Sequence, residues 1–281
     1  MSLPSYAGPL ETAWYYGYRF ICGLIFLFLI LPILVIIPLS FNAEPYFTFT
    51  PGMLSLDPDA FSFRWYEDMV TNVQWTHSAK NSVIIAFFST ILATGLGTLA
   101  ALGLSKSYMP FRSLFILISP MIVPLIISAA GMFFFYSDVG LSSTLTGIVL
   151  AHTALGTPFV IITVTATLVG FDQSLNRAAL SLGANPRTVF FKVTMPLILP
   201  GVISGALFAF ITSFDEVVVV LFLAGYEERT IPRQMFSGLR EQISPTILAV
   251  ATVLVAISIA LLASLEILRR RNERLRGITP H

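Results

Sequence analysis

The stretch that decides the fold runs Asp172-Gln-Ser-Leu-Asn-Arg-Ala-Ala-Leu-Ser-Leu-Gly183-Ala-Asn-Pro-Arg-Thr-Val-Phe-Phe-Lys-Val-Thr-Met-Pro196 and separates two long apolar runs. It is too patterned for a plain connection, because cap and turn residues stand where helices begin and end. Asp172 is expected to N-cap a short helix, and Gly183 is expected to end it. One face of that helix would carry Leu175, Ala178, Ala179 and Leu182.

A second short helix is predicted directly after the first. Asn185 has the side chain of an N-cap, and Pro186 has the fixed φ of a first helical residue. Residues 172–195, here called the elbow, are therefore predicted to fold as two short helices at an angle. The small side chains of Ala178 and Ala179 would let another protein approach closely, as when a helix docks in a groove.

The sequence around the elbow is far more apolar than that of a soluble protein. Of the 281 residues, 56% are apolar and 11% are charged, against about 25% charged in an ordinary soluble domain. Six runs of at least 22 residues contain no Asp, Glu, Lys or Arg: 20–43, 81–105, 113–137, 139–171, 193–214 and 242–265. A helix needs about 20 residues to cross the hydrocarbon layer, so each run can span once. The chain is predicted to be an all-α, polytopic membrane protein with six transmembrane helices and one domain over residues 1–281.

Two of the runs differ from a simple span. The fourth begins with polar residues, so we expect its helix to occupy about 146–170. The fifth continues beyond Asp215 and Glu216 into a second apolar stretch, so its helix is expected to carry two acids at membrane depth. Gly201 and Gly205 of the same helix form a small face that favours close packing against another span.

Charges divide unequally between the two sets of loops. The N-terminus, residues 106–112, the elbow and the tail from Glu266 hold 11 basic and 4 acidic residues, whereas 42–80, 137–140 and 225–241 hold 5 basic and 9 acidic ones. The positive-inside rule then places both termini and the elbow in the cytoplasm. We interpret the basic cluster of the tail as a topology anchor rather than a nucleic-acid patch; it consists of Arg269, Arg270, Arg271, Arg274 and Arg276.

The sequence lacks the motifs of an ATPase, a metalloenzyme or a hydrolase. A phosphate-binding loop needs a lysine after a glycine, and none of the three lysines follows one. The three histidines are too scattered to predict a metal site. We therefore expect no catalytic residue, metal or cofactor in this chain. His152, in the fourth run, is either a proton relay or, as we prefer, a group that satisfies backbone carbonyls freed near Pro158.

The elbow resembles the signature segment in the membrane subunits of ATP-binding-cassette (ABC) importers that work with a substrate-binding protein. Their pattern is Glu-Ala-Ala, three residues, Gly, nine residues and Ile-x-Leu-Pro. This chain has Arg177-Ala178-Ala179, Gly183 and Val193-Thr194-Met195-Pro196 at the same spacing. Arg177 replaces the usual Glu, so a charge-paired contact to the ATPase subunit is not carried over there. The resemblance covers about residues 60–268, including Arg64-Trp65-Tyr66, Asn81-Ser82, Pro158-Phe159 and Ile231-Pro232.

The resemblance implies a type I ABC importer permease fold in a bacterial inner membrane, and a transport subunit rather than an enzyme. Two ATP-binding subunits, which hold ATP and Mg²⁺, would dock on the elbow. A second permease, expected to be a different chain, would complete the pathway, and a periplasmic binding protein would deliver substrate. The surroundings would be membrane lipid, and no nucleic acid is expected. The residues implied in coupling to the ATPases are Arg177, Ala178, Ala179, Leu182, Gly183, Asn185 and Pro186.

A further resemblance lies in the fifth run. Ser213-Phe214-Asp215-Glu216-Val217-Val218-Val219 is similar to the spermidine and putrescine permeases of that family, as is 234–245. Acids at membrane depth cost about 2.5 to 3.5 kcal/mol to insert, so both should avoid lipid. We expect Asp215 to face the substrate, because carboxylates and aromatic faces attract ammonium groups, and Glu216 to pair within the bundle. A structural role for both acids is the alternative. The residues expected to line the path are Asp215, Glu216, Thr212, Phe208 and Phe222.

These patterns favour a polyamine importer that works by alternating access. Ferric iron, 4-aminobutyrate or another amino acid, and an opine are alternative substrates within the same family. An ion-coupled secondary transporter, with protons or sodium carried on the two acids, is a rival of another class. The elbow and the lack of an inverted repeat argue against that rival. An intramembrane enzyme is disfavoured because no plausible nucleophile and base are present.

Overall fold

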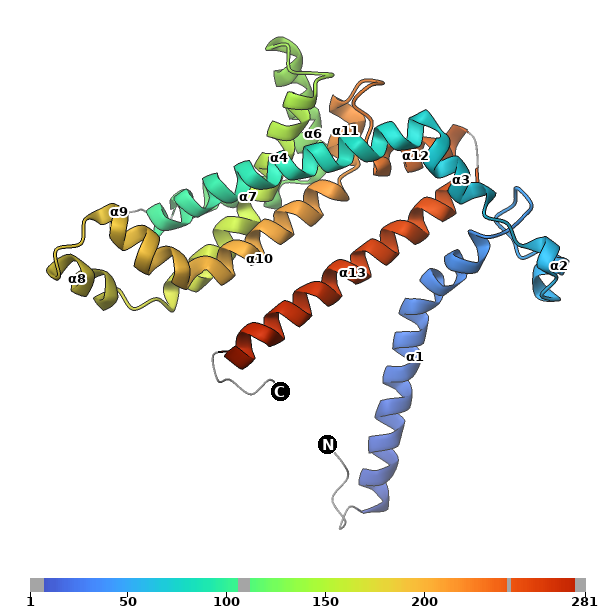
Figure 1. Ribbon diagram of the computed structural model, residues 1–281, viewed down its shortest axis with the longest axis horizontal. Helices are drawn as coiled ribbons and strands as arrows, with labels where there is room; N and C mark the ends of the chain where they lie inside the picture. Colours follow the sequence, from blue (N-terminus) through green and yellow to red (C-terminus); the bar gives the residue numbers. More distant parts are fainter. Residues whose placement is uncertain (1–7, 106–111, 242–243, 276–281) are drawn as a thin grey trace. The chain divides into compact units, whose positions relative to one another are not determined.

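The computed structural model describes residues 8–105, 112–241 and 244–275 (Figure 1). Within them the chain is helical, without β-strands, and an isolated bridge joins Asn42 and Phe61. The all-α prediction is confirmed. The predicted orientation also used the charges of residues 106–111 and Arg276, which lie outside the described residues.

The long helices are α1 (Pro9–Leu39), α4 (Val73–Leu104), α7 (Leu145–Val169), α10 (Met195–Phe214) and α13 (Thr246–Leu275). The shorter elements are α2 (Pro51–Leu54), the 3-10 turn η1 (Pro58–Ala60), α3 (Arg64–Thr71), α5 (Arg112–Ile122), α6 (Leu125–Asp138), α8 (Ser174–Ser181), α9 (Pro186–Val189), the π-helical turn η2 (Phe190–Thr194), α11 (Val218–Leu223) and α12 (Ile231–Glu241).

Within the described residues, each of the six predicted runs lies mostly on helices, and residues 242 and 243 of the sixth run lie outside the described part. Four helical segments in the described part are long and apolar enough to cross a membrane: α1, α4, α7 and the continuous stretch Pro186–Phe214. α6 and the Thr246–Ala260 part of α13 are shorter apolar helices. The helix expected over 146–170 is observed as α7.

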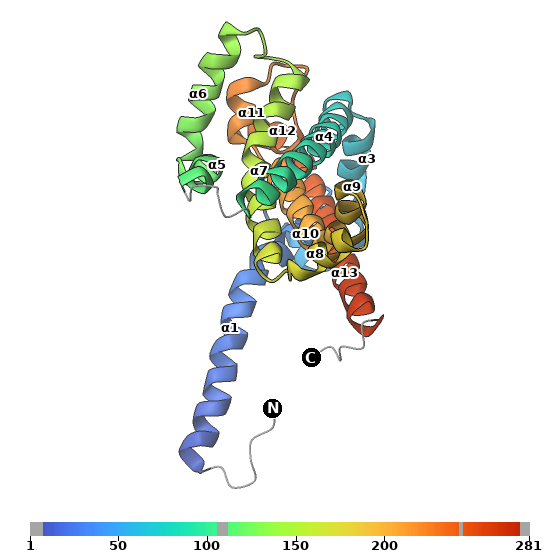
Figure 2. The same ribbon diagram turned by 90° about the vertical axis from the view of Figure 1, so that its left-hand side faces the viewer.

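The third run is split between two helices. α5 ends at Ile122 and α6 begins at Leu125, with Pro124 as the N-cap residue of α6. Proline has no N–H to donate and disfavours helical backbone in the preceding residue, so Pro124 separates the two helices. α6 packs beside α11, as both views show (Figures 1 and 2).

The chain divides into two compact units. One, the terminal unit, consists of residues 1–72 and 238–281, and the other, the central unit, of residues 73–237. The central unit contains the elbow and the acidic pair. Its core is formed by α4, α7 and α10, which lie side by side (Figure 1).

Glycines let these three helices approach closely. A Cβ atom added at Gly97 of α4 would lie 2.6 Å from the Cβ of Val160 on α7. One added at Gly156 of α7 would lie 3.0 Å from the Cβ of Ala209 on α10. Small residues of this kind replace hydrophobic collapse as the basis of helix association in membranes, where van der Waals packing dominates.

The small face predicted on α10 packs against α7. A Cβ added at Gly205 would lie 2.5 Å from Thr163 Oγ1, and one added at Gly201 would meet the side chain of Thr167. The close packing expected from these two glycines is therefore confirmed.

In the terminal unit, polar contacts fix the segment after α1 and the start of α13. Trp65, from the motif Arg64-Trp65-Tyr66, donates its Nε1–H to the carbonyl of Asn42 at 2.7 Å. Thr246, the first residue of α13, donates its hydroxyl to Asp68 Oδ2 on α3 at 2.7 Å. The motif thus has a structural role within this unit.

Candidate transport path and coupling elbow

The elbow begins with a turn that precedes α8. Asp172 accepts hydrogen bonds from the hydroxyl of Ser174 at 2.6 Å and from its backbone N–H at 2.8 Å. These bonds hold the pKa of the Asp172 carboxyl below its usual range, and the charge of Arg177 adds to the effect. The predicted cap is wrong by one position, because Asp172 closes a turn ahead of the helix and Gln173 is the N-cap residue.

α8 ends in the way the sequence predicts. Gly183 has φ +86°, a left-handed conformation that glycine adopts without a steric penalty. The N–H of Gly183 donates to the carbonyl of Leu180 at 3.0 Å, and the N–H of Ala184 donates to the carbonyl of Ala179 at 3.1 Å. Together these bonds satisfy the last carbonyls of the helix, so the predicted stop is confirmed.

The second helix of the elbow also begins where expected. The Asn185 side chain accepts the backbone N–H of Thr188 at 2.8 Å, and Pro186 is the first residue of α9. α9 then continues through η2 into α10, so the elbow leads without interruption into the fifth apolar run.

The expected coupling residues lie together on the surface of the elbow. Six are exposed and Ala179 is half-buried; the exposed ones are Arg177, Ala178, Leu182, Gly183, Asn185 and Pro186. Leu182, the C-cap residue of α8, is 89% exposed, and two leucines within α8, Leu175 and Leu180, are also exposed. The surface therefore combines small and apolar side chains with the positive charge of Arg177.

Asn176 connects α8 to the segment at the N-terminal end of α10. Its Oδ1 accepts a hydrogen bond from the hydroxyl of Thr194 at 3.1 Å, across 18 residues of chain. Thr194 is the last residue of η2 and is buried, with 6% exposure. Sequence reasoning missed this pair, because Asn176 lies just before the signature pattern and Thr194 occupies an unspecified position within it.

The fifth apolar run is not one continuous helix. α10 ends at Phe214 and α11 begins at Val218, so residues 215–217 form a break. The prediction of a helix that runs through both acids is wrong. Val217 is the N-cap residue of α11, and the preceding residue Glu216 caps the helix through its side chain, because its Oε1 accepts the backbone N–H of Val219 at 2.9 Å. An acid is favoured at a helix start because the first N–H groups there are unpaired within the helix.

The two neighbouring acids occupy different environments. Glu216 is buried, with 8% exposure, whereas Asp215 is exposed. Their carboxylates therefore differ in what they are able to contact. The Glu216 carboxylate faces the first backbone N–H groups of α11, whereas the Asp215 side chain is exposed.

Three of the expected path residues lie near the end of α10. Phe208, Thr212 and Asp215 follow one another at spacings of four and three residues, which places them on one helix face. Phe208 is 51% exposed and stacks with Phe159 of α7, with 6.2 Å between the ring centroids. Phe222, 36% exposed, belongs to α11 beyond the break and so lies on a different helix from Phe208 and Thr212.

The last turn of α10 is fixed to both neighbouring helices by a buried polar cluster. Ser213 Oγ lies 2.8 Å from His152 Nδ1 on α7 and accepts a hydrogen bond from Ser89 Oγ on α4 at 2.9 Å. His152 is 1% exposed. It therefore bonds a hydroxyl rather than a carbonyl freed near Pro158, which corrects the interpretation from sequence.

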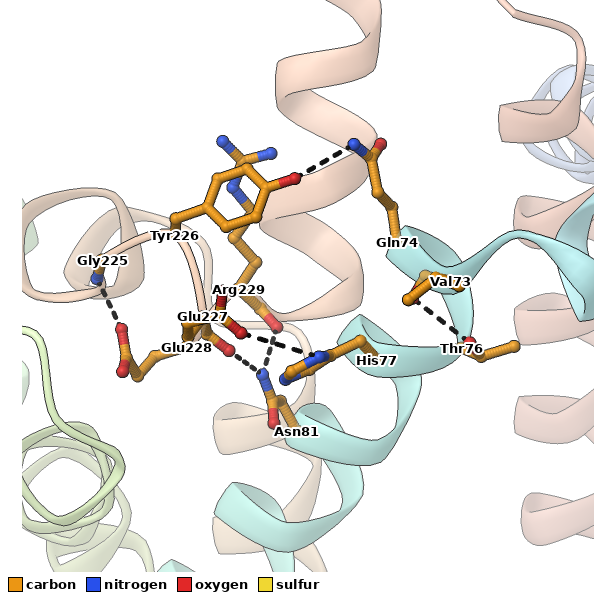
Figure 3. A network of polar contacts seen from close by, with 10 residues as sticks. All are labelled: Val73, Gln74, Thr76, His77, Asn81, Gly225, Tyr226, Glu227, Glu228 and Arg229. Atoms are coloured by element: carbon orange, nitrogen blue, oxygen red, sulfur yellow. Dashed lines mark hydrogen bonds and ion pairs between the residues drawn. The ribbon is translucent and has the colours of Figure 1, made fainter.

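The loop after α11 is held against the start of α4, as Figure 3 shows. Asn81 Nδ2 donates to the carbonyl oxygens of Glu227 at 2.7 Å and Arg229 at 3.1 Å. Ser82 Oγ accepts the backbone N–H of Ile231 at 2.8 Å. Two motifs that are far apart in the sequence, Asn81-Ser82 and the one that begins at Ile231, are thus in direct contact.

The comparisons agree with the geometry. Residues 93–275 match the family described as binding-protein-dependent transport system inner membrane component. The chain is 33% identical to the spermidine/putrescine transport system permease protein PotC of Haemophilus influenzae, over 88% of this chain and 94% of that protein. It is 30% identical to the putrescine transport system permease protein PotI of Escherichia coli K12, over 90% and 91%.

Among solved structures, the fold is similar to a bacterial ABC transporter involved in the import of the acidic polysaccharide alginate. The TM-score is 0.70 at 18% identity, over 95% of this chain and 99% of that one. The type I ABC importer permease fold is thereby confirmed. This chain belongs to the family of binding-protein-dependent transport system inner membrane components and is a multi-pass membrane protein.

Proposed function

We propose that this chain imports polyamines as one permease subunit of an ABC transporter. The observation that carries the proposal is the break at residues 215–217, where Asp215 is exposed while Glu216 is buried as the cap of α11. PotC and PotI, whose names assign them to spermidine and putrescine transport, support the same class of substrate.

The chemistry of the break suits a flexible polycation. A carboxylate within an apolar run needs water or a cation as its partner, because lipid solvates charge poorly. Interrupted helices in transporters supply such groups at substrate sites. Asp215 would attract an ammonium group, while the rings of Phe208 and Phe222 would contact cations and methylene groups. A polyamine carries both kinds of group.

The elbow suits a docking site for the ATPase subunits. Its exposed leucines supply apolar area, and Arg177 supplies a cation where the family usually has an acid. The partner surface should therefore carry an acid opposite Arg177. ATP and Mg²⁺ would be bound by two ATPase subunits, and this chain would contribute no catalytic group.

The remaining partners follow from the same arrangement. A second permease, of different sequence, would cover the exposed face of α10 that carries Phe208 and Asp215. A periplasmic binding protein would deliver substrate on the side opposite the elbow. Both termini and the elbow would be cytoplasmic, because the basic residues gather on that side. Closure of the ATPases would then alternate access to the path.

Uptake measurements test the proposal. Cells with and without this chain are given labelled putrescine, spermidine and 4-aminobutyrate in turn. We expect the chain to be required for polyamine uptake and dispensable for 4-aminobutyrate uptake. A protonophore, added with cellular ATP maintained, should leave polyamine uptake intact, whereas an ion-coupled carrier would stop. Equal uptake of both polyamines with and without the chain would contradict the substrate assignment.

A further inference from the structure

The elbow and α10 are joined by one side-chain hydrogen bond whose position suggests a mechanical role. Thr194 Oγ1 donates to Asn176 Oδ1 at 3.1 Å. Asn176 lies on α8, next to the exposed docking residues Arg177 and Ala178, and Thr194 directly precedes α10. The bond thus connects the docking helix to the residue immediately before α10, the helix that leads to Asp215.

The two serine hydroxyls of α8 make local bonds. Ser174 donates to Asp172, and Ser181 donates to the carbonyl of Arg177 within the same helix. Asn176 differs because it is half-buried and its partner is buried. Along the backbone, α8 and α10 are separated by the turn at Gly183, so the side-chain bond is the shorter connection.

The π-helical turn explains why Thr194 is available for this bond. η2 places the N–H of Met195 on the carbonyl of Phe190, five residues earlier. A π-turn accommodates one extra residue in a helix, and each residue rotates the following side chains by about 100°. The turn therefore sets the direction of Thr194 relative to the docking helix. Such turns recur at functional sites because their hydrogen-bond geometry is less favourable than that of an α-helix.

We infer that the Asn176–Thr194 hydrogen bond is the strut that transmits movement of the docked α8 to α10. α10 is 20 residues long, about 30 Å, and it ends beside the break that carries Asp215. Movement applied at Thr194 therefore reaches the acid through one helix. Asn176 and Thr194 are positioning residues that do not contact substrate. The inference rests on the proposed function, since it assigns the route between its two sites.

Matched substitutions test the strut in the complete transporter, reconstituted in proteoliposomes with its binding protein and putrescine. Thr194→Val keeps the shape and removes the hydroxyl, whereas Thr194→Ser keeps the hydroxyl. Asn176→Ala removes the acceptor, whereas Asn176→Asp keeps an oxygen at the same atom. The measured quantity is putrescine transported per ATP hydrolysed. Ser181→Ala is the control, because its bond stays within α8.

Thr194→Val and Asn176→Ala should each lower transport per ATP by about two- to tenfold, the range expected for one neutral hydrogen bond. Thr194→Ser, Asn176→Asp and Ser181→Ala should stay near the wild-type ratio. The double variant Thr194→Val with Asn176→Ala should be no worse than either single one, because both remove the same bond. An unchanged ratio in the two single variants, or additive losses in the double one, would overturn the strut.

A wrong substrate assignment would give a different result from a wrong inference about the Asn176–Thr194 bond. If the wild-type transporter does not carry putrescine, the substrate assignment is wrong, and the strut is then judged by a second ratio. This ratio compares ATP hydrolysis with and without the binding protein, and it does not require putrescine to be the substrate. The strut predicts that Thr194→Val lowers this stimulation and Thr194→Ser preserves it. Equal stimulation in both variants would overturn it.

Discussion

The carboxylate of Glu216 accepts the backbone N–H of Val219 at 2.9 Å and caps α11 across the break that follows α10. Its neighbour Asp215 is exposed. A cap needs an acceptor oxygen, whereas attraction of an ammonium group needs negative charge. Replacement of an acid by its amide therefore distinguishes the two roles.

Glu216→Gln should preserve the cap, because the amide oxygen accepts the same N–H, and uptake should remain near wild type. Glu216→Ala removes the cap and should destabilise the protein by about 1 kcal/mol, with a fall in uptake. Thermal unfolding of the purified transporter in detergent measures the loss of stability. If Gln proves as damaging as Ala, the charge of Glu216 matters rather than its cap.

Asp215→Asn should lower putrescine uptake by about tenfold or more at low substrate concentration. The amide retains hydrogen bonding but loses the charge, and a charge-assisted contact is worth about 1.5 to 3 kcal/mol. Initial uptake rates over a range of putrescine concentrations measure the effect, with Glu216→Gln as the matched control. Wild-type rates in Asp215→Asn would make the acid structural and remove the physical basis of the cationic substrate.

Local chemistry explains which parts of the elbow and spans the sequence could predict. Gly183, Asn185 and Pro186 end and start helices through their own backbone preferences, so their roles were predictable from position alone. Pro124 carried the same kind of signal, which would have revealed the split between α5 and α6. The search for runs without charged residues did not detect this split, because it treats a proline within a span as one more uncharged residue.

The break at residues 215–217 and the polar contacts between helices were not predictable in this way. Hydropathy does not show that the Glu216 side chain will take the N–H of Val219. Nor does any sequence period reveal that Ser213 will meet His152, because that contact depends on how α10 packs against α7. Residues whose role depends on partners distant in the sequence can be identified only from the three-dimensional structure.

Gly183→Val should impair the elbow while the protein still inserts in the membrane. The residue has φ +86°, which costs a β-branched side chain about 1 to 2 kcal/mol, although no atom lies within 4 Å of an added Cβ. The penalty therefore comes from the local backbone conformation rather than from a clash with another part of the protein. Gly183→Asn should restore transport, since Asn tolerates this backbone. Uptake and the amount of co-purified ATPase are the measurements; normal values in Gly183→Val would make the elbow a simple connector.

Gly205→Ala should destabilise the central unit by about 1 to 3 kcal/mol, the usual range for overpacking. The added methyl would lie 2.5 Å from Thr163 Oγ1 and 2.8 Å from the Cα of Val160, so backbone must move. Gly95→Ala of α4 is the control, because its added Cβ meets nothing within 4 Å and a helical alanine is favoured. Thermal unfolding in detergent should separate the two variants. Equal stability would contradict the close contact between α7 and α10.

The orientation of the chain is tested by cysteines at two exposed serines, Ser181 on the elbow and Ser55 after α2. The background is Cys22→Ala, since Cys22 is the only native cysteine. The basic excess places Ser181 in the cytoplasm and Ser55 outside. An impermeant thiol reagent added to intact spheroplasts should therefore label the Ser55→Cys variant and spare the Ser181→Cys variant, while permeabilised cells should label both. Labelling of Ser181→Cys alone in intact spheroplasts would reverse the orientation, and the elbow would then be unable to reach an ATPase that uses cytoplasmic ATP.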